Sequence, residues 1–266
     1  MPHLTVGQNL WAIVGGLISG GLMTIVGGGG SALAVPILTT LVGLTRVRLA
    51  MGTMAVSIAT TAIVSAIVHA RRGHVSWRAA FWFVGPGLIG VLLGSKLQHD
   101  FSRPVLMTML ALVLLGNAGL MVWMPAPPNG SHGNAVRGLI RLGPLGALVG
   151  LLAGMLGGGG GFLALPSMML GGLSLATAVG SSVVSMGSLG AVSAVNFALR
   201  GLVDWRVVVE YGLGGLCGAF LAAPVAERLS GQQRRLTLLV SVVLMMVSLY
   251  LMANNVPQLY RPGQVI

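Results

Sequence analysis

Charged residues are scarce in this 266-residue chain, where Asp, Glu, Lys and Arg together make up 7% of the sequence. Ordinary globular proteins carry roughly 25%. Hydrophobic residues account for 55%, and apolar stretches recur from Trp11 to Met252, each near the ~20 residues that cross a bilayer. A soluble protein of this length cannot cover its surface with so few charges. The composition therefore excludes a soluble domain and predicts an all-α, polytopic membrane protein.

Acidic residues are the rarest charged type, with 4 Asp and Glu against 15 Lys and Arg, which gives a net charge of +11. In a soluble protein this balance would suggest nucleic acid as a partner. Here the arginines fall singly or in pairs between apolar segments, without interleaved aromatic residues. We interpret them as loop charges that meet anionic lipid and help to set topology. The predicted partner is the lipid bilayer, and no nucleic acid is expected.

Cysteine is almost absent, and the single Cys217 excludes an internal disulfide and any multi-cysteine metal or redox site. We predict no cofactor and no metal. Ionisable groups inside the apolar stretches are also few, although such groups are commonly functional. Only Glu210 and His69 are plausible proton carriers, and we interpret His69 as an interfacial residue at a helix end. The N-terminus has no positively charged n-region and no cleavage site, so the first apolar segment is predicted to be retained.

Two glycine-rich segments repeat along the chain. Residues 27–36 and 157–166 both read GGGGxxLAxP. Further on, residues 52–78 match residues 180–206 at a constant offset, and 12 of the 27 positions are identical, including Arg, Gly and Trp. Shared apolar composition explains matched Val and Ala but not these residues in register. The repeat predicts an internal duplication.

The predicted halves are residues 1–124 and 143–266, joined by a linker at 125–142 whose first part is rich in turn-forming residues. Each half has a glycine-broken apolar stretch followed by three ordinary transmembrane helices. The expected spans are 50–69, 79–98 and 105–124 in the first half and 178–198, 207–226 and 236–253 in the second. The two halves form one transmembrane domain.

The broken stretches decide the topology. Residues 10–43 would make a helix of about 51 Å, too long for a ~30 Å hydrocarbon core, yet they are too few for two full spans. The stretch is either a re-entrant hairpin of two half-helices or one discontinuous crossing. A hairpin leaves three crossings in each half and inverts the second half, whereas a discontinuous crossing gives a parallel duplication. The basic residues divide almost evenly in both cases. We favour an inverted repeat, which is common where transporter repeats contain paired broken helices.

Runs of four or five glycines at membrane depth are unfavourable in a helix. Glycine permits positive φ and close backbone approach, and unwound backbone at that depth is tolerated only where it is buried in protein or lines a cavity. The N-terminus of the helix that follows carries unpaired donors suited to an anion. We predict that the paired runs form binding-site backbone, whereas Gly15, Gly16, Gly20 and Gly21 are predicted to pack helices together.

Hydroxyl groups gather in the helices that follow. Thr53 and Ser57, like Ser181 and Ser185, are spaced i, i+4 and so share a helix face. Such neutral donors can bind an oxyanion, although they can equally bond to their own or a neighbouring helix. The predicted substrate-binding residues are Gly27, Gly28, Gly29, Gly30, Ser31, Pro36, Thr53, Ser57, Gly157, Gly158, Gly159, Gly160, Gly161, Pro166, Ser181 and Ser185.

At these residues the sequence resembles the TauE/SafE family of sulfite and organosulfur-anion exporters. The resemblance rests on the two GGGGxxLAxP segments, each followed by a small-residue helix start at residues 50–53 and 178–181. It covers nearly the whole chain. It implies a multi-pass protein of the bacterial inner membrane that moves sulfite, sulfonates or related small anions, generally outwards. The matching residues are Gly27 to Gly30, Pro36, Gly157 to Gly160 and Pro166.

We therefore predict a secondary transporter for a small sulfur-containing oxyanion, not an enzyme. The two glycine loops are expected to meet near the midplane, and the halves to rock about them in alternating access. An anion channel built from the same parts is the alternative. An intramembrane serine hydrolase using Ser188 is a third and weaker hypothesis, because no histidine occupies a clear mid-span position. The sequence leaves a homo-oligomer open.

Overall fold

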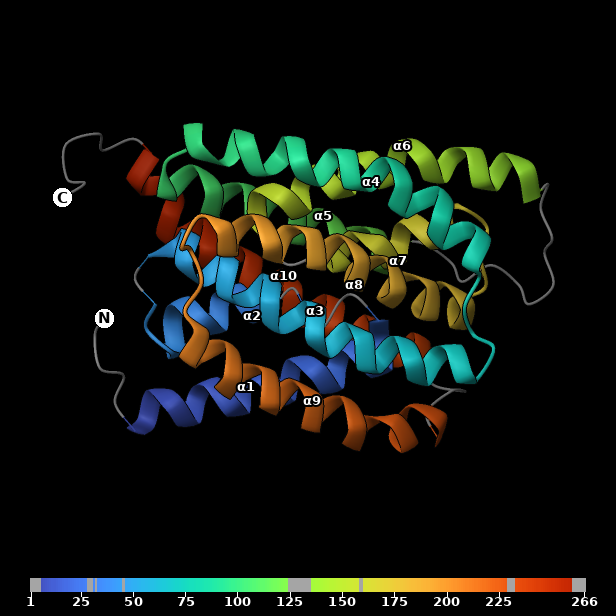
Figure 1. Ribbon diagram of the computed structural model, residues 1–266, viewed down its shortest axis with the longest axis horizontal. Coiled ribbons are helices and arrows are strands. Elements are labelled where there is room, and N and C mark those ends of the chain that lie inside the picture. The colour runs from blue at the N-terminus through green and yellow to red at the C-terminus, as the bar shows by residue number, and fades with distance from the viewer. Residues whose placement is uncertain are drawn as a thin grey trace.

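The computed structural model describes residues 6–27, 31, 33–44, 46–123, 135–157, 160–228 and 233–259. Over these ranges the chain is helical, with no strand (Figure 1). The elements are α1 (Val6–Val26), α2 (Ala34–Pro36), the π-helix η2 (Ile37–Leu41), α3 (Val47–Arg71), α4 (Trp77–Leu97), the 3₁₀-helix η3 (Gln98–Asp100), α5 (Arg103–Trp123), α6 (Ala135–Leu156), α7 (Gly161–Leu170), α8 (Leu175–Leu199), α9 (Trp205–Arg228) and α10 (Gln233–Leu259).

Eight of the described helices are long and apolar enough to cross a membrane: α1, α3, α4 with η3, α5, α6, α8, α9 and α10. Their outward faces carry large apolar side chains, with Phe81 76%, Phe220 73% and Trp123 89% exposed. Apolar side chains in such numbers on an outer face need a lipid environment. The predicted all-α, polytopic fold is confirmed.

Both glycine-broken stretches return to the end of the bundle from which they started. In the first, a Cβ on Gly15 would lie 2.5 Å from Ile37 Cγ2, and one on Gly43 would lie 2.8 Å from Gln8 Nε2. In the second, a Cβ on Gly138 would overlap the carbonyl oxygen of Gly171. Each stretch is thus a hairpin and not a single discontinuous crossing.

The hairpins differ from the pairs of half-helices that we expected, because their arms are unequal. The first arms, α1 and α6, have 21 and 22 residues, and each is long enough to be a span. The second arms are short: α2 and η2 have 3 and 5 residues, and α7 has 10. Helix α6 also begins at Ala135, inside the range that we predicted as linker, because apolar residues resume there.

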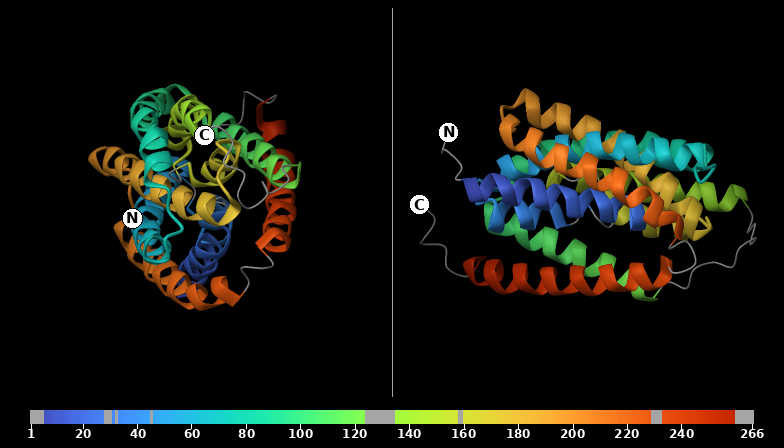
Figure 2. Two further views of the ribbon diagram at one scale, coloured as in Figure 1. Left: turned by 90° about the vertical axis from the view of Figure 1, so that its right-hand side faces the viewer. Right: turned by 90° about the horizontal axis from the view of Figure 1, so that it is seen from below.

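Helix directions follow from the contacts between glycines and neighbouring backbone. Gly16 and Gly20 of α1 meet Tyr211 and Gly215 of α9, so these two helices run in the same direction. Helices α4 and α6 are likewise parallel, with Gly146 and Gly150 on α6 meeting Phe83 and Gly87 on α4. Helix α1 begins, and α10 ends, at the same end of the bundle, with α5 and α10 side by side (Figures 1 and 2).

Contacts at matched positions of the two halves are the same in kind. A Cβ on Gly52 would overlap the Leu202 carbonyl, and one on Gly180 would overlap the His74 carbonyl. Helix α1 packs chiefly on α9, and its counterpart α6 packs chiefly on α4. Because α1 and α6 start at opposite ends of the bundle, this arrangement is the one that an inverted duplication requires. The duplication itself stays a prediction from the sequence repeat.

Candidate functional site

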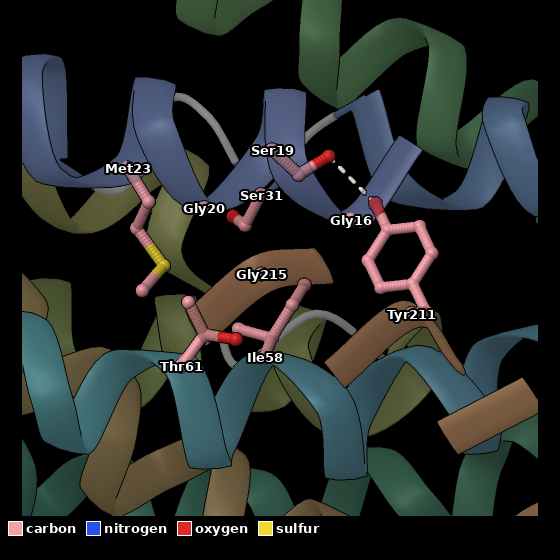
Figure 3. A pocket seen from close by; sticks show the side chains of 9 residues that line it. All are labelled: Gly16, Ser19, Gly20, Met23, Ser31, Ile58, Thr61, Tyr211 and Gly215. Atoms are coloured by element: carbon pink, nitrogen blue, oxygen red, sulfur yellow. Dashed lines mark hydrogen bonds between the residues drawn. The ribbon is translucent and has the colours of Figure 1, made fainter. Parts of the chain in front are cut away.

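A small cavity lies between the middle parts of α1, α3 and α9, with one residue from the first glycine-rich segment (Figure 3). Its lining residues are Gly16, Ser19, Gly20, Met23, Ser31, Ile58, Thr61, Tyr211 and Gly215. The space open to the centre of a water molecule is about 10 Å³, which is room for about one water. The cavity is therefore too small for more than about one water-sized molecule.

Neutral hydroxyl groups supply the polarity of this cavity. The hydroxyls of Ser19 and Tyr211 share a hydrogen bond of 2.6 Å across α1 and α9 (Figure 3). Thr61 Oγ1, which also lines the cavity, donates to the Ser57 carbonyl at 2.8 Å. Among the described residues, no Asp, Glu, Lys, Arg or His lines the cavity. An anion here would be held by donors without a fixed counter-charge.

Glycines bring the walls of the cavity together. A Cβ on Gly16 would overlap the Tyr211 carbonyl, and one on Gly20 would overlap the Gly215 carbonyl. The packing role predicted for Gly16 and Gly20 is therefore confirmed, and both also line the cavity. Gly15 faces the returning arm at Ile37, whereas a Cβ on Gly21 would find its nearest atom at 3.6 Å, an ordinary contact.

The glycine-rich breaks begin at opposite ends of the bundle. Gly27 and Gly157 end α1 and α6 with φ of +79° and +84°, a conformation that other residues rarely adopt. Gly27 lies against Val179 and Ser182 of α8, and Gly157 lies against the Met51 backbone of α3.

The segments that follow these breaks converge. Ser31 Oγ is 2.9 Å from the position of a Cβ on Gly161, the first residue of α7. The two glycine-rich segments therefore approach each other at Ser31 and Gly161, and Ser31 carries this junction into the cavity.

The remaining predicted glycine and proline residues either lie in or beside the second arms of the hairpins or fall outside the described residues. Gly28, Gly29, Gly30, Gly158 and Gly159 lie outside the described residues. Gly160 precedes α7 and is buried, Pro166 lies inside α7, and Pro36 ends α2. Among the predicted substrate-binding residues that the structure describes, Ser31 alone belongs to the cavity lining.

The hydroxyls predicted at the helix starts serve backbone partners. Thr53 Oγ1 accepts a hydrogen bond of 2.9 Å from the Asp204 N–H, and Ser181 Oγ accepts one of 2.9 Å from the Ser76 N–H. One turn on, Ser57 and Ser185 donate to the carbonyls of Thr53 and Ser181 at 3.0 and 2.9 Å. Thr53 and Ser181 therefore join loops to helices, Ser57 and Ser185 bond within their own helices, and all four lie outside the cavity lining.

Sequence reasoning missed Ser19 and Tyr211. Ser19 sits in a small-residue face that we assigned to helix packing alone. Tyr211 is one of 3 tyrosines, and it is 2% exposed in an apolar helix. A buried tyrosine hydroxyl needs a partner, and this was the available signal.

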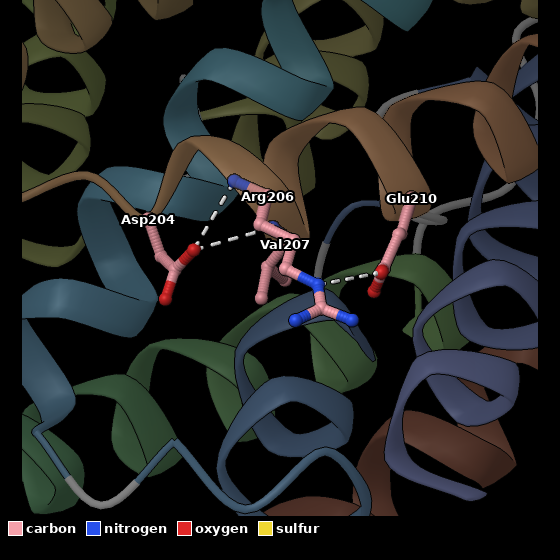
Figure 4. A network of polar contacts seen from close by, with 4 residues as sticks. All are labelled: Asp204, Arg206, Val207 and Glu210. Atoms are coloured by element: carbon pink, nitrogen blue, oxygen red, sulfur yellow. Dashed lines mark hydrogen bonds and ion pairs between the residues drawn. The ribbon is translucent and has the colours of Figure 1, made fainter. Parts of the chain in front are cut away.

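The two ionisable candidates lie near opposite ends of the site. Glu210 Oε1 pairs with Arg206 Nε at 3.3 Å, next to Asp204, whose carboxylate accepts the N–H groups of Arg206 and Val207 (Figure 4). His69 lies in the last turn of α3, at the helix end as predicted, but it is only 4% exposed and its Nε2 lies 3.1 Å from the Thr24 carbonyl. The neighbouring Arg71 and Arg72 suggested an exposed helix end, and nothing in the sequence indicated that α1 and α8 would cover His69.

Comparison with known proteins fits this arrangement. The model of the sulfite exporter TauE/SafE family matches residues 12–251. The chain belongs to this family. It is 34% identical to a probable membrane transporter protein of Xylella fastidiosa (strain Temecula1), over 93% of this chain and 96% of that protein. It is also 24% identical to the probable membrane transporter protein YdhB of Bacillus subtilis, over 76% of this chain and 84% of that protein. No solved structure matches.

The family and the eight candidate spans identify a multi-pass membrane transporter of the bacterial inner membrane. The partners that the family implies are a small anion and the surrounding lipid. The cavity between α1, α3 and α9 is the candidate site for that anion.

Proposed function

We propose that this protein exports a small sulfur-containing oxyanion, sulfite or an organosulfonate, by alternating access. The observation that carries the proposal is a small cavity at the middle of α1, α3 and α9, whose described lining holds hydroxyls, glycines and two apolar side chains but no charged one, in a chain of the sulfite exporter family. Ser31 and Gly161 bring the two glycine-rich segments to this cavity. The predicted glycine residues then act mainly by shaping the site.

The cavity supports a carrier over a channel. A channel needs a continuous pathway and weak binding along it, whereas this cavity has room for about one water. A sulfur oxyanion is larger than water, so binding requires α1 and α9 to separate from α3. A carrier that alternates access opens and closes its site in this way, here with α1 and α9 of different halves moving together.

Neutral donors suit the outward direction of transport. Ser19 and Tyr211 share one hydrogen bond, so one of their two hydroxyls keeps a proton for an oxyanion, whereas Thr61 must first release the Ser57 carbonyl. Such neutral donors release an oxyanion more readily than a fixed positive charge would. A membrane potential of 100 mV, negative inside, favours exit of one negative charge by about 2.3 kcal/mol. Export of an anion therefore needs no strong binding to proceed.

The serine hydrolase hypothesis receives no support from the site. Ser188 donates its hydroxyl to the Val184 carbonyl at 3.0 Å, within its own helix. A nucleophilic serine needs a base within hydrogen-bond reach. Ser188→Ala is expected to leave transport unchanged.

Flux of sulfite and of isethionate, a simple sulfonate, into proteoliposomes tests the proposal. Thr61→Val removes a cavity hydroxyl with little change of volume, and Gly161→Ala places a methyl against Ser31 Oγ and Met186. Gly116→Ala in α5 is the matched control, because a Cβ there meets nothing within 4 Å. We expect saturable, counterflow-stimulated flux, a KM raised about 3- to 10-fold by Thr61→Val, and no effect of Gly116→Ala. Unsaturable flux would indicate a channel, and no flux of either anion would overturn the substrate class.

A further inference from the structure

A line of polar side chains connects the cavity to one end of α3. Thr61 lines the cavity, and Ser65 and His69 follow it at successive i+4 positions, which lie one above another on the helix. All three are buried, with Thr61 4%, Ser65 0% and His69 4% exposed. Polar side chains are rarely so buried at successive turns of one transmembrane helix unless they serve a pathway or a partner.

His69 is held in one orientation and has one ring nitrogen free. Its Nε2 lies 3.1 Å from the Thr24 carbonyl of α1, and since a carbonyl only accepts, Nε2 carries a proton. Its Nδ1 is buried and has no hydrogen-bond partner, and the same is true of Ser65 Oγ one turn away. A neutral imidazole in this orientation presents the Nδ1 lone pair, which can take a proton.

The second link between His69 and the cavity runs through α1. The Thr24 hydroxyl donates to the Gly20 carbonyl at 3.1 Å, and Gly20 lines the cavity. His69 is therefore linked to the cavity wall on α1 through Thr24, and on α3 it follows Thr61 and Ser65 along the same helix face. The equivalent residue of the second half is Phe197, which is also buried and cannot bind a proton. The two ends of the site are thus chemically different.

Few charges face His69 from the elements packed on it. Helices α1 and α8 contain no ionisable side chain. His74 lies with its ring centroid 6.4 Å from that of His69. Arg72, three residues on, donates to the Ala223 carbonyl of α9, whose last turn holds Glu227 and Arg228. Arg71 is exposed.

We propose that His69 binds a proton at Nδ1 and so couples proton binding to anion binding in the cavity, an inference that rests on the proposed transport function. A proton from water at that end of the bundle adds to the lone pair, which gives an imidazolium that still donates through Nε2. No other bond forms or breaks, and the proton leaves by the reverse step. The added positive charge attracts the anion toward Thr61.

The size of the effect follows from the distance. Eight residues of α3 separate Thr61 from His69, which is about 12 Å along the helix. At an effective dielectric constant of about 20, a unit positive charge at that distance strengthens the binding of one negative charge about tenfold. The KM of the anion should fall by this factor when His69 is protonated.

The test is the pH dependence of isethionate flux in proteoliposomes between about pH 5 and pH 8, where histidine changes charge while the sulfonate keeps its own. His69→Gln retains an N–H that reaches the Thr24 carbonyl but cannot titrate, and His74→Gln is the matched control on the neighbouring ring. We expect KM to fall about tenfold toward acid pH in the wild type and in His74→Gln, and to stay constant in His69→Gln.

Each other outcome overturns a distinct claim. An unchanged pH response of the KM in His69→Gln would remove His69 as the coupling group, and loss of the response in His74→Gln instead would assign the role to His74. Wild-type protein that carries no isethionate and no sulfite would overturn the proposed function, and the coupling with it. Should His69→Gln fail to fold, His69→Phe takes its place, because it carries the ring that the second half holds at Phe197.

Discussion

The Thr53 hydroxyl accepts a hydrogen bond of 2.9 Å from the backbone N–H of Asp204, which lies 151 residues further along the chain. The Ser181 hydroxyl accepts the same kind of bond, also of 2.9 Å, from the N–H of Ser76. Both acceptors lie near the start of the helix that follows a glycine-broken stretch, Thr53 in α3 and Ser181 in α8. Each donor directly precedes a helix of the opposite half, Asp204 before α9 and Ser76 before α4. Each half therefore fixes the entry to a helix of the other through one buried hydroxyl.

Replacing Thr53 with Val should destabilise the protein without changing anion affinity. The change keeps the side-chain shape but leaves the Asp204 N–H without its acceptor, at a cost of about 1–3 kcal/mol. We expect a lower thermal midpoint, measured by tryptophan fluorescence in detergent, and an unchanged KM for sulfite. Thr53→Ser retains the hydroxyl and should behave as wild type. A raised KM at unchanged stability would instead place Thr53 in the substrate site, as the sequence alone suggested.

The close packing of α1 on α9 should be necessary for both stability and transport. Gly16→Ala puts a methyl into the Tyr211 carbonyl, so the helices must move apart, and overpacking of this kind costs typically 1–3 kcal/mol. Gly21→Ala, on the same helix, meets its nearest atom at 3.6 Å and is the control. We expect Gly16→Ala to lower both the thermal midpoint and the flux, and Gly21→Ala to alter neither. Equal thermal midpoints and equal flux in the two variants would show that the close contact between Gly16 and Tyr211 is not needed for stability or transport.

Composition and repeat predicted the main features of the fold because both are properties of whole segments. Scarce charge predicted spans, and the matched Arg, Gly and Trp residues predicted two similar halves. The return of residues 10–43 was left open because periodicity does not report where a broken stretch ends in space. Contacts such as Gly43 against Gln8 depend on packing between distant parts of a hairpin. The unequal arms follow from the position of Gly27, which allows α1 to complete a span first.

The site was harder to predict than the fold. The glycine runs were conspicuous, yet Gly27 and Gly157 start at opposite ends of the bundle, and only Ser31 reaches the cavity. Thr53 and Ser181 look like ligands in sequence because their backbone partners are more than 100 residues away. Ser19 and Tyr211 form a pair only once α1 and α9 are packed together. A single sequence does not contain that pairing.

The Ser19–Tyr211 pair should contribute to anion binding as a unit. Ser19→Ala and Tyr211→Phe each remove one hydroxyl of the 2.6 Å bond, and one hydrogen bond is worth about 0.5–1.5 kcal/mol. Each change should raise the KM for isethionate about 3- to 10-fold, and the double variant should lose less than the product of the two, because the residues touch. Kinetics of the four proteins in one lipid mixture measure this. Independent, multiplicative effects would mean that the two hydroxyls bind the anion separately.

Side-specific labelling tests the direction of the two halves. Gly73 and Gly201 occupy equivalent loops after α3 and α8, each with positive φ and with nothing within 4 Å of an added Cβ. Replacing each with Cys, in a Cys217→Ser background that leaves no other thiol, therefore carries the same conformational cost of about 1–2 kcal/mol. Because each glycine-broken stretch returns to its starting end, the two loops lie at opposite ends of the bundle. A membrane-impermeant maleimide applied to intact cells should label one of the two variants, and permeabilised cells should allow labelling of both. Labelling of both from outside, or of neither, would contradict the inverted arrangement and indicate that the two halves run in parallel.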